Sequence, residues 1–247
     1  MGEERHPESV RRVRASNPSP LTLDGTNTYL VGGWVVDPGP DDAAHRRAVL
    51  AAAGGGIEGI VLTHTHPDHS EGAEALAAEA GGVDVVLPRD GDEIGPLTAI
   101  ATPGHAPDHV CLLLTGGACL AGDLVLGQGS VFIAPGEGSL SAYLDSLRRV
   151  RALDLDVLCP GHGPYVWNPA AKIDEYVEHR LERERLLVDA LDAGARDDDA
   201  LLDRAWADVP PELRFAARFS LHAHLEKLRE EGRLPPDLPP ARYPRQP

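Results

Sequence analysis

Short apolar runs bounded by glycine and proline dominate the first two thirds of the chain. Such runs are typical of buried strands. They predict strands over residues 27–31, 34–37, 57–63, 83–87, 97–102, 110–115, 118–122 and 156–159. Helical spacing or alanine-rich composition predicts helices over about 41–53, 70–80 and 139–153. Strands with interleaved helices predict an α/β domain with mixed sheets.

The pattern becomes helical near residue 169. A long, charged, amphipathic helix is predicted from Asn168-Pro169 to about residue 193, and we interpret it as a covering helix. Aspartates at 197–199 open a second helix, and Pro210-Pro211 opens a third that ends at Gly232. We therefore divide the chain into a first domain, 1–169, and a small helical domain, 170–247, which resembles a helix-turn-helix with a short wing.

Composition and charge exclude several classes of protein. The 247 residues include 42% hydrophobic and 25% charged residues, which is ordinary for a globular protein. With 23 basic and 39 acidic residues the formal charge is −16, so the chain is no general binder of polyanions. No apolar run approaches the roughly 20 residues that span a bilayer, and no signal peptide is visible. We therefore expect a cytoplasmic protein without a membrane partner.

Two smaller features are interpreted as structural. The three cysteines, Cys111, Cys119 and Cys159, lack CxxC spacing, which argues against a disulfide framework and a zinc knuckle. The basic run around Arg11 and Arg14 is interpreted as a solvated terminal segment.

The densest group of candidate metal ligands is the segment 64–69, with the sequence HTHPDH. It follows an apolar strand, and alternate residues of an extended segment point to the same side, so His64 and His66 face the same way. The turn at Pro67 can place Asp68 and His69 beside them. Imidazole and carboxylate are good ligands for zinc and similar divalent ions.

Further candidates lie downstream in glycine-flanked loops that adjoin predicted strands. They are His105, Asp123 and His162. Glycine allows a tight turn, so a side chain at a strand end can point inward. Seven ligands are enough for two ions with three ligands each and one shared carboxylate.

In this order, HxHxDH, GH, AGD and PGHG resemble the metallo-β-lactamase superfamily, over about residues 20–167. The resemblance implies a four-layer αββα sandwich with metals at one edge of its two sheets. It assigns one metal to His64, His66 and His105. The other metal takes Asp68, His69 and His162, with Asp123 and a water or hydroxide as bridges. The implied cofactors are two Zn²⁺ ions, and the same ligands also suit iron or manganese.

The implied reaction is attack by the metal-bridging hydroxide on an acyl carbon or a phosphorus. We expect Asp68 to be catalytic, orienting this hydroxide and later carrying a proton. Asp37 is a candidate acceptor for a ligand imidazole, and His109 is expected to play a structural or supporting role. His222 and His224 lie two residues apart on a predicted helix, so we expect them to pack or face solvent and not to share a site.

Among the branches of the superfamily, the chain resembles the lactamase-β-like group most. The matching segments are TNTYLVG, TPGHAPDHVCLLL, AGDLVLGQGSVFI, PGHGP and NPAAKIDEYVEHR. This group contains an endoribonuclease and thioesterases, shares motifs with glyoxalase II, and carries a winged-helix-like C-terminal domain. Thiol-ligated β-lactamases have a cysteine where this chain has Asp123, so antibiotic hydrolysis is not expected.

The sequence does not decide which of two kinds of bond the protein cleaves, an acyl ester or thioester bond or a phosphodiester bond. The negative charge and only 4% aromatic residues favour an ester or thioester, on a small molecule or an acyl carrier, over a single-stranded RNA. RNA cleavage is the main alternative, and a non-enzymatic winged-helix regulator that binds nucleic acid is the second. Gly129 and Ser130 follow the bridging carboxylate and are candidate substrate-lining residues. The helical domain can wall one side of the cleft, and nothing in the sequence sets the oligomeric state.

Overall fold

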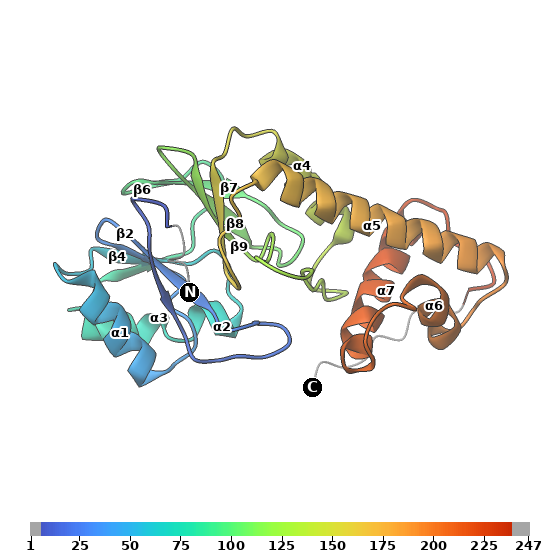
Figure 1. The fold of residues 1–247 in the computed structure, drawn as a ribbon, viewed down its shortest axis with the longest axis horizontal. Coiled ribbons are helices and arrows are strands. Elements are labelled where there is room, and N and C mark those ends of the chain that lie inside the picture. Colours follow the sequence, from blue (N-terminus) through green and yellow to red (C-terminus); the bar gives the residue numbers. More distant parts are fainter. Residues whose placement is uncertain (1–5, 239–247) are drawn as a thin grey trace.

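Two five-stranded sheets pack face to face, and helices cover their outer faces (Figure 1). The structure is a computed structural model that describes residues 6–238. The ends of the two predicted domain ranges, 1–5 and 239–247, lie outside the described residues. The arrangement confirms the expected αββα sandwich, with a helical unit attached at its C-terminal end.

The first sheet has the strand order β1-β2-β3-β4-β5. Its strands are β1 (Arg11–Arg14), β2 (Asn27–Val31), β3 (Trp34–Val36), β4 (Gly59–Val61) and β5 (Asp84–Val86). The pairs β1–β2 and β2–β3 are antiparallel, whereas β3–β4 and β4–β5 are parallel. Parallel pairing needs a crossover, which α1 (Ala43–Ala53) provides between β3 and β4.

The second sheet has the order β10-β9-β8-β7-β6. Its strands are β6 (Glu93–Ile94), β7 (Leu97–Ala101), β8 (Val110–Leu114), β9 (Ala118–Gly122) and β10 (Val157–Pro160). Only β9–β10 is parallel, and α4 (Leu140–Arg151) makes that crossover. The other pairs are antiparallel and joined by short connections.

Alternation along the strands explains the layers. In β2, Tyr29 and Val31 pack in the core between the sheets, whereas Leu30 packs against the outer helices. In β10, Val157 enters the core between the sheets and Leu158 the core under the helices. Successive side chains of a strand point to opposite faces, so strands covered on both sides are apolar throughout.

Helices bury each outer face. Helix α1 and α3 (Ala73–Glu79) cover the first sheet, with α2 (Pro67–Ser70) directly before α3. Helix α4 and the first turns of α5 (Pro169–Asp192) cover the second sheet. Asp42 caps α1 and Ser139 caps α4, in each case by accepting a hydrogen bond from a backbone N–H of the first turn.

The C-terminal unit has its own apolar core. The end of α5 packs with α6 (Asp198–Ala205) and α7 (Arg214–Glu230), and the 3₁₀ turn η1 (Pro211–Leu213) directly precedes α7. Within the described part of this unit, all regular structure is helical. No helix in residues 6–238 combines the length and the apolar character needed to cross a bilayer.

Four short elements differ from the sequence-based expectation. The basic segment 11–14 is not a solvated terminus, because β1 pairs with β2 from Arg11–Leu30 to Arg14–Asn27. The long strand expected over 57–63 is limited to β4, since the chain leaves the sheet to form the loop of the histidine motif. Strand β6 and helix α2 were not predicted, because two and four residues are too short to show a period.

Candidate metal centre and active-site cleft

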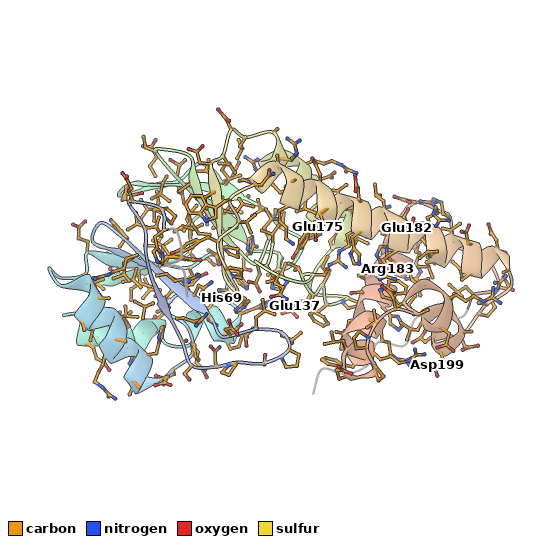
Figure 2. All side chains as sticks on the ribbon, in the orientation of Figure 1. His69, Glu137, Glu175, Glu182, Arg183 and Asp199 are labelled. Atoms are coloured by element: carbon orange, nitrogen blue, oxygen red, sulfur yellow. The ribbon has the colours of Figure 1, made fainter. Side chains whose placement is uncertain are left out.

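The seven predicted ligands meet where strands of both sheets end. His64, His66, Asp68 and His69 follow β4, so they come from the first sheet. The other three follow β7, β9 and β10 of the second sheet: His105, Asp123 and His162. Figure 2 shows His69 at the edge of the sandwich, with Glu137 between it and the C-terminal helices. The structure thus brings all seven side chains to one edge.

These side chains form two groups, each containing residues from both sheets. In the first group, the ligand atoms of His64, His66 and His105 lie within 4.8 Å of one another. In the second group, the same holds for Asp68, His69 and His162. These are the two ligand sets that the resemblance implied.

Asp123 lies between the two groups. Its Oδ1 is 3.5 Å from Nε2 of His69 and 3.5 Å from Nε2 of His162. Its Oδ2 is 3.5 Å from Nε2 of His105. One carboxylate oxygen therefore faces each group, which is the arrangement a bridging ligand needs.

Hydrogen bonds on the outer side of four of the five imidazoles, all except His66, fix their tautomers. Nδ1 of His69 donates to Oδ2 of Asp37 at 2.8 Å, and Nδ1 of His105 donates to the Phe132 carbonyl at 2.7 Å. Nδ1 of His162 lies 3.4 Å from the Gly25 carbonyl. Because Nδ1 carries the proton in each ring, the Nε2 lone pair points to the centre.

The tautomer of His64 is fixed in the same way, but by a hydroxyl group. Thr63 donates its hydroxyl proton to Oδ2 of Asp37 at 2.7 Å, so its oxygen accepts from Nδ1 of His64 at 3.0 Å. Nε2 of His64 is then unprotonated, and it is buried without a hydrogen-bond partner. Oδ1 of Asp123 is likewise buried without one. Two orphaned acceptors beside converging lone pairs fit a cation site.

Asp37 and His109 lie behind the candidate ligands and form hydrogen bonds with them. Asp37 is buried, and besides His69 it accepts from the backbone N–H of Thr63 at 2.7 Å. Its oxygens are thus engaged, although its position also groups it with His64 and His69. Nε2 of His109 accepts from the backbone N–H of Asp123 at 3.0 Å, and its Nδ1 contacts the Thr102 hydroxyl at 2.8 Å. Both residues lie where a supporting role was expected.

At two positions the backbone passes so close to the side chains of the centre that only glycine fits. A Cβ on Gly161 would lie 2.6 Å from Oδ1 of Asp123 and 2.6 Å from Cε1 of His69. A Cβ on Gly122, where φ is +47°, would lie 2.6 Å from Nε2 of His109. Glycine therefore allows the backbone to pass behind the ligands.

The carboxylates give the centre a negative potential. Burial disfavours the charged form of His69, but Asp123 and Asp37 outweigh it and hold the pKa of His69 well above its usual value. Burial acts the same way on His162, yet Asp123 and Asp68 raise its pKa to about 9. The group of Asp68, His69 and His162 thus stabilises positive charge, which suits a divalent cation. In the other group, burial and neighbouring imidazoles lower the pKa of His64 and His105.

The centre opens into a cleft of about 540 Å³. His66, Asp68, His105, Asp123 and His162 line it, whereas His64 and His69 lie behind them. The opposite wall is apolar and comes partly from the C-terminal unit. It consists of Pro20, Leu21, Leu126, Val131, Phe132, Ala134, Phe215 and Phe219. The C-terminal helices thus wall one side of the cleft.

The expected substrate-lining residues lie close together but differ in position. Ser130 is part of the cleft wall, whereas Gly129 lines only the pocket next to it. The Gly129 carbonyl accepts a hydrogen bond from Tyr176 at 2.8 Å.

Several supporting residues were not found from the sequence. Thr63 and the Phe132 carbonyl orient ligand histidines, and Asp108 accepts two bonds from Thr65 inside the histidine motif. Glu137 lies 3.7 Å from Nε2 of His66. Asp108 stands in the run PGHAPDH beside His109, which could have indicated it. A backbone carbonyl has no sequence signal.

The remaining histidines and the cysteines lie in packed surroundings. His222 and His224 are buried in the C-terminal unit, where His222 contacts Asp198 at 2.8 Å. Cys111, Cys119 and Cys159 are free and buried.

Comparison with known families places both parts of the chain. The family model of the metallo-beta-lactamase superfamily matches residues 21–95 and 80–162. The model of the beta-lactamase associated winged helix domain matches residues 199–234. Together they cover the sandwich from β2 to β10 and, apart from the first residue of α6, the helices α6 and α7.

Similar proteins and solved structures support the same family assignment. A Beta-lactamase-like protein 2 homolog of Caenorhabditis elegans is 32% identical, over 91% of this chain and 85% of its own length. The crystal structure of a metallo-beta-lactamase family protein from Thermus thermophilus is 26% identical, with a TM-score of 0.70, and covers 91% of this chain and 94% of that one. A protein crystallised in a di-iron-bound form is 26% identical, with a TM-score of 0.54, and covers 65% and 96%. The chain therefore belongs to the metallo-β-lactamase superfamily and is a metal-dependent hydrolase.

Proposed function

We propose that the protein is a dinuclear zinc hydrolase that cleaves esters or thioesters of apolar acyl groups. The observation that carries the proposal is the set of imidazole lone pairs and carboxylate oxygens that converge on two points beside an apolar cleft. His64, His66 and His105 would hold one ion. Asp68, His69 and His162 would hold the other, with Asp123 shared.

The donor set suits zinc, and nitrogen and oxygen ligands also accept iron or manganese. The related protein crystallised with two irons supports a centre for two ions. When bound, two such ions lower the pKa of a water molecule and polarise the bond to be cleaved. The chemistry of these ligands is therefore our reason for proposing zinc.

The protein contributes orientation and proton transfer. Asp68 is the one carboxylate of the centre with substantial exposure, 32% of its side chain, and it lines the cleft. Its Oδ2 lies 3.2 Å from Nε2 of His162. A carboxylate in this position can hold the attacking water, accept its proton and pass that proton to the leaving group. We assign Asp68 this catalytic role.

The cleft favours an acyl group over a nucleic acid. Its lining contains no lysine or arginine among the described residues, and it contains Glu137 in addition to the carboxylates of the centre. RNA binding relies on basic side chains that neutralise phosphates. Leu21 and Phe215, 43% and 49% exposed, instead offer apolar surface beside the metals. Burial of this surface by an acyl chain would contribute to binding.

The test compares both bonds in one preparation. Zinc-loaded protein is assayed with an octanoyl thioester and with a labelled, unstructured RNA, and bound metal is measured by mass spectrometry. We expect thioester cleavage, its loss in Asp68→Ala, and loss of activity with a reduced metal content in His162→Ala. Asp84→Ala, an exposed change in the edge strand β5, should behave as wild type.

The two rival functions give different outcomes. Cleavage of the RNA that disappears in Asp68→Ala, without thioester cleavage, would make the protein an endoribonuclease. Equal activity of wild type and His162→Ala would remove the metal-dependent reaction. Tight RNA binding without cleavage of either substrate would favour the non-enzymatic regulator.

A further inference from the structure

A second pocket lies between the sandwich and the C-terminal unit and adjoins the metal cleft. This interdomain pocket has a volume of about 260 Å³. It shares six lining residues with the cleft: Pro20, Leu21, Leu126, Ser130, Val131 and Phe132. Most of the remaining wall comes from α5, from the segment between α6 and α7, and from α7, and it includes Trp206, Val209, Leu213 and Ala217. A chain that starts at the metals can therefore continue along one apolar wall into this pocket.

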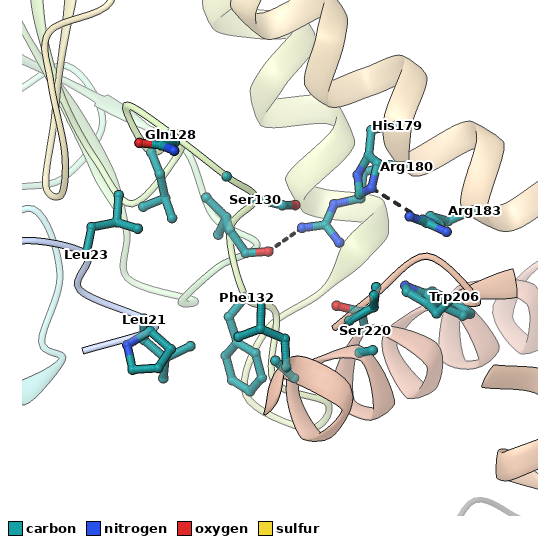
Figure 3. A pocket seen from close by; sticks show the side chains of 18 residues that line it. Leu21, Leu23, Gln128, Ser130, Phe132, His179, Arg180, Arg183, Trp206 and Ser220 are labelled. Carbon is teal, nitrogen blue, oxygen red and sulfur yellow. Dashed lines mark hydrogen bonds between the residues drawn. The ribbon is translucent and has the colours of Figure 1, made fainter. Parts of the chain in front are cut away.

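Two arginines of α5 enter the pocket in different ways. Arg183 is buried and makes a bidentate ion pair with Asp208, both bonds being 2.6 Å. Arg180 is 97% buried, since its exposed fraction is 3%. Its Nη2 donates to the Val131 carbonyl, and its Cζ lies 5.6 Å from the centre of the Tyr143 ring. Figure 3 shows its side chain reaching from α5 across the pocket, above Phe132 and Ser220 in this view.

Among the described residues, Arg180 is a buried cation without a compensating anion. Its Nε is buried and has no hydrogen-bond partner. Within residues 6–238, the structure gives this guanidinium no ion pair with a carboxylate. A buried charge without a partner costs free energy, and a guanidinium pairs best with a carboxylate or phosphate. This indicates an anionic group of a ligand.

The charges around the pocket add up to one positive charge. Arg183 and Asp208 cancel. His179 also lines the pocket, and burial together with Arg180 and Arg183 lowers its pKa to about 4, so it is neutral near pH 7. Glu184 is engaged elsewhere, with Lys227 and Arg233. One unpaired positive charge matches a monoanion such as a carboxylate better than a doubly charged phosphate.

We propose that the interdomain pocket binds the far end of the acyl group, and that Arg180 selects acyl groups that end in a carboxylate. The substrate class is then monoesters or monothioesters of dicarboxylic acids. The apolar wall covers the methylene chain, and Arg180 forms the charge-assisted hydrogen bond at its end. This inference rests on the proposed function for the position of the scissile bond, but the pocket can be tested by binding alone.

The first measurement is calorimetric binding to the full-length, zinc-loaded protein. The probes are suberanilic acid, which ends in a carboxylate, and octananilide, which has the same chain length and no charge. Anilides resist hydrolysis, so binding is observed without turnover. We expect the carboxylate probe to bind about 10- to 100-fold more tightly, as a charge-assisted hydrogen bond provides. Equal affinities in the wild type would overturn the proposal without any variant.

Variants locate the site of this preference. Arg180→Gln should reduce it to near unity, and Arg180→Lys, which keeps the charge, should retain part of it. Arg185→Gln is the matched control, because Arg185 is an exposed residue of the same helix that pairs with Glu182 and Asp189. A preference that survives Arg180→Gln but disappears in His162→Ala would place the carboxylate at the metals and overturn the proposal. An anilide of the same chain length ending in a phosphate should bind more weakly, and tighter binding would refute selection of a monoanion.

Turnover separates this inference from the proposed function. With mono-4-nitrophenyl suberate and 4-nitrophenyl octanoate, the preference should appear mainly in KM, since Arg180 contacts a part of the substrate remote from the reaction. If neither ester is hydrolysed but the carboxylate probe binds through Arg180, the proposed function fails and the pocket stands. If both esters are hydrolysed at equal kcat/KM by wild type and Arg180→Gln, the pocket assignment fails and the hydrolase stands.

Discussion

At the scale of single residues, the centre depends on which nitrogen of each histidine carries a proton. Asp37 controls two of these choices, directly through His69 and through the Thr63 hydroxyl for His64. This makes a buried carboxylate outside the ligand set as important as a ligand. The consequence can be tested without altering any ligand.

Asp37→Asn should weaken metal binding while preserving shape. An amide can present its NH₂ group to Nδ1 of His69, which would move the ring proton to Nε2 and remove the lone pair from the centre. We expect metal affinity to fall about 10- to 100-fold, as for other changes behind metal ligands. Competition with a chromogenic chelator measures it, and Asp84→Asn serves as the control. Unchanged affinity would contradict the tautomer assignment.

The buried side chain of His224 is expected to lower the stability of the C-terminal unit. Both ring nitrogens are buried without a hydrogen-bond partner, and the ring packs edge-on against Trp206 at 5.6 Å between centroids. Burial, with Arg180 and Lys227, holds its pKa well below the usual value, so it is neutral. His224→Phe should remove two unsatisfied polar atoms and raise the free energy of unfolding by about 1 kcal/mol.

Urea unfolding of the metal-loaded protein measures this change. His222→Phe is the matched contrast, because Nε2 of His222 contacts Asp198 at 2.8 Å and the substitution removes that bond. We expect the two substitutions to act in opposite directions. A loss of stability in both would mean that His224 has a partner that the packing does not reveal.

That the seven candidate ligands gather at one edge could be predicted from the sequence, but most of the groups that hydrogen-bond to them could not. The seven ligand candidates stand in short motifs beside apolar runs, and the strand ends carry them to one edge. Asp37 was singled out because it ends a predicted strand, and His109 because it follows His105 in the same short run. The Phe132 and Gly25 carbonyls belong to the backbone, so the residue types at these positions gave no indication that they contact ligand histidines. The burial of Arg180 could not be predicted, because it lies in a helix with many charged residues and its burial depends on how α5 packs.

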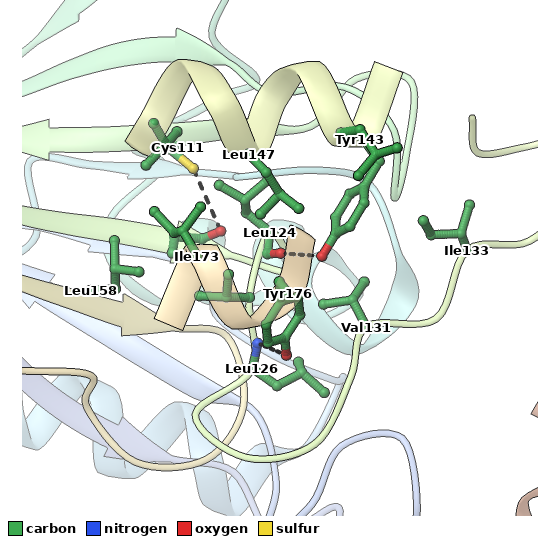
Figure 4. Close-up of a cluster of buried hydrophobic side chains, with 14 of the residues drawn as sticks. Cys111, Leu124, Leu126, Val131, Ile133, Tyr143, Leu147, Leu158, Ile173 and Tyr176 are labelled. Carbon is green, nitrogen blue, oxygen red and sulfur yellow. Dashed lines mark hydrogen bonds between the residues drawn. The ribbon is translucent and has the colours of Figure 1, made fainter. Parts of the chain in front are cut away.

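At the scale of elements, α5 joins the two parts of the molecule. Its first turns lie on the second sheet, and its last turns belong to the C-terminal core. The hydroxyl of Tyr176 accepts a hydrogen bond from the Leu126 N–H at 3.0 Å (Figure 4). It also donates to the Gly129 carbonyl at 2.8 Å. This helix therefore fastens the loop that lines both the cleft and the interdomain pocket.

Tyr176→Phe should loosen that loop. The substitution leaves the buried N–H of Leu126 without its acceptor, which costs about 1–3 kcal/mol of stability. We also expect KM for acyl substrates to rise, because the loop carries Ser130 and Phe132 into the cleft wall. Chemical denaturation and steady-state kinetics measure the two effects. Glu175→Gln, an exposed neighbour on α5, is the control. A variant with wild-type stability would show that the loop holds without this bond.

Sequence patterns predicted the longer elements well and the short ones poorly. The strands at 27–31 and 118–122 have the predicted bounds, because apolar residues fill them and turns bound them. Strand β1 was missed because three arginines surround Val13, and only pairing with β2 makes the segment extended. The boundary between the predicted domains at residue 169 stays a prediction, since α5 begins there and packs with both parts.

At the scale of the whole molecule, each proposed metal ligand set spans both sheets. His64 and His66 follow β4 of the first sheet, whereas His105 follows β7 of the second. Asp68 and His69 are joined in the same way by His162 after β10. Either set is complete only when the sheets are docked, so metal should bind the folded protein and not the unfolded chain. Binding of this kind stabilises the native state by mass action.

Removal of metal should therefore lower the melting temperature of the whole sandwich. At a free zinc concentration about 100 times Kd, each site adds about 2.7 kcal/mol, which corresponds to a shift of roughly 5–10 °C for a domain of this size. Calorimetric scans of zinc-loaded and chelator-treated protein measure the shift. His162→Ala should keep part of it, since the set of His64, His66 and His105 is intact. Equal melting temperatures with and without zinc would mean that the two sheets are held by their apolar core alone, and that the converging side chains do not bind metal in the folded state.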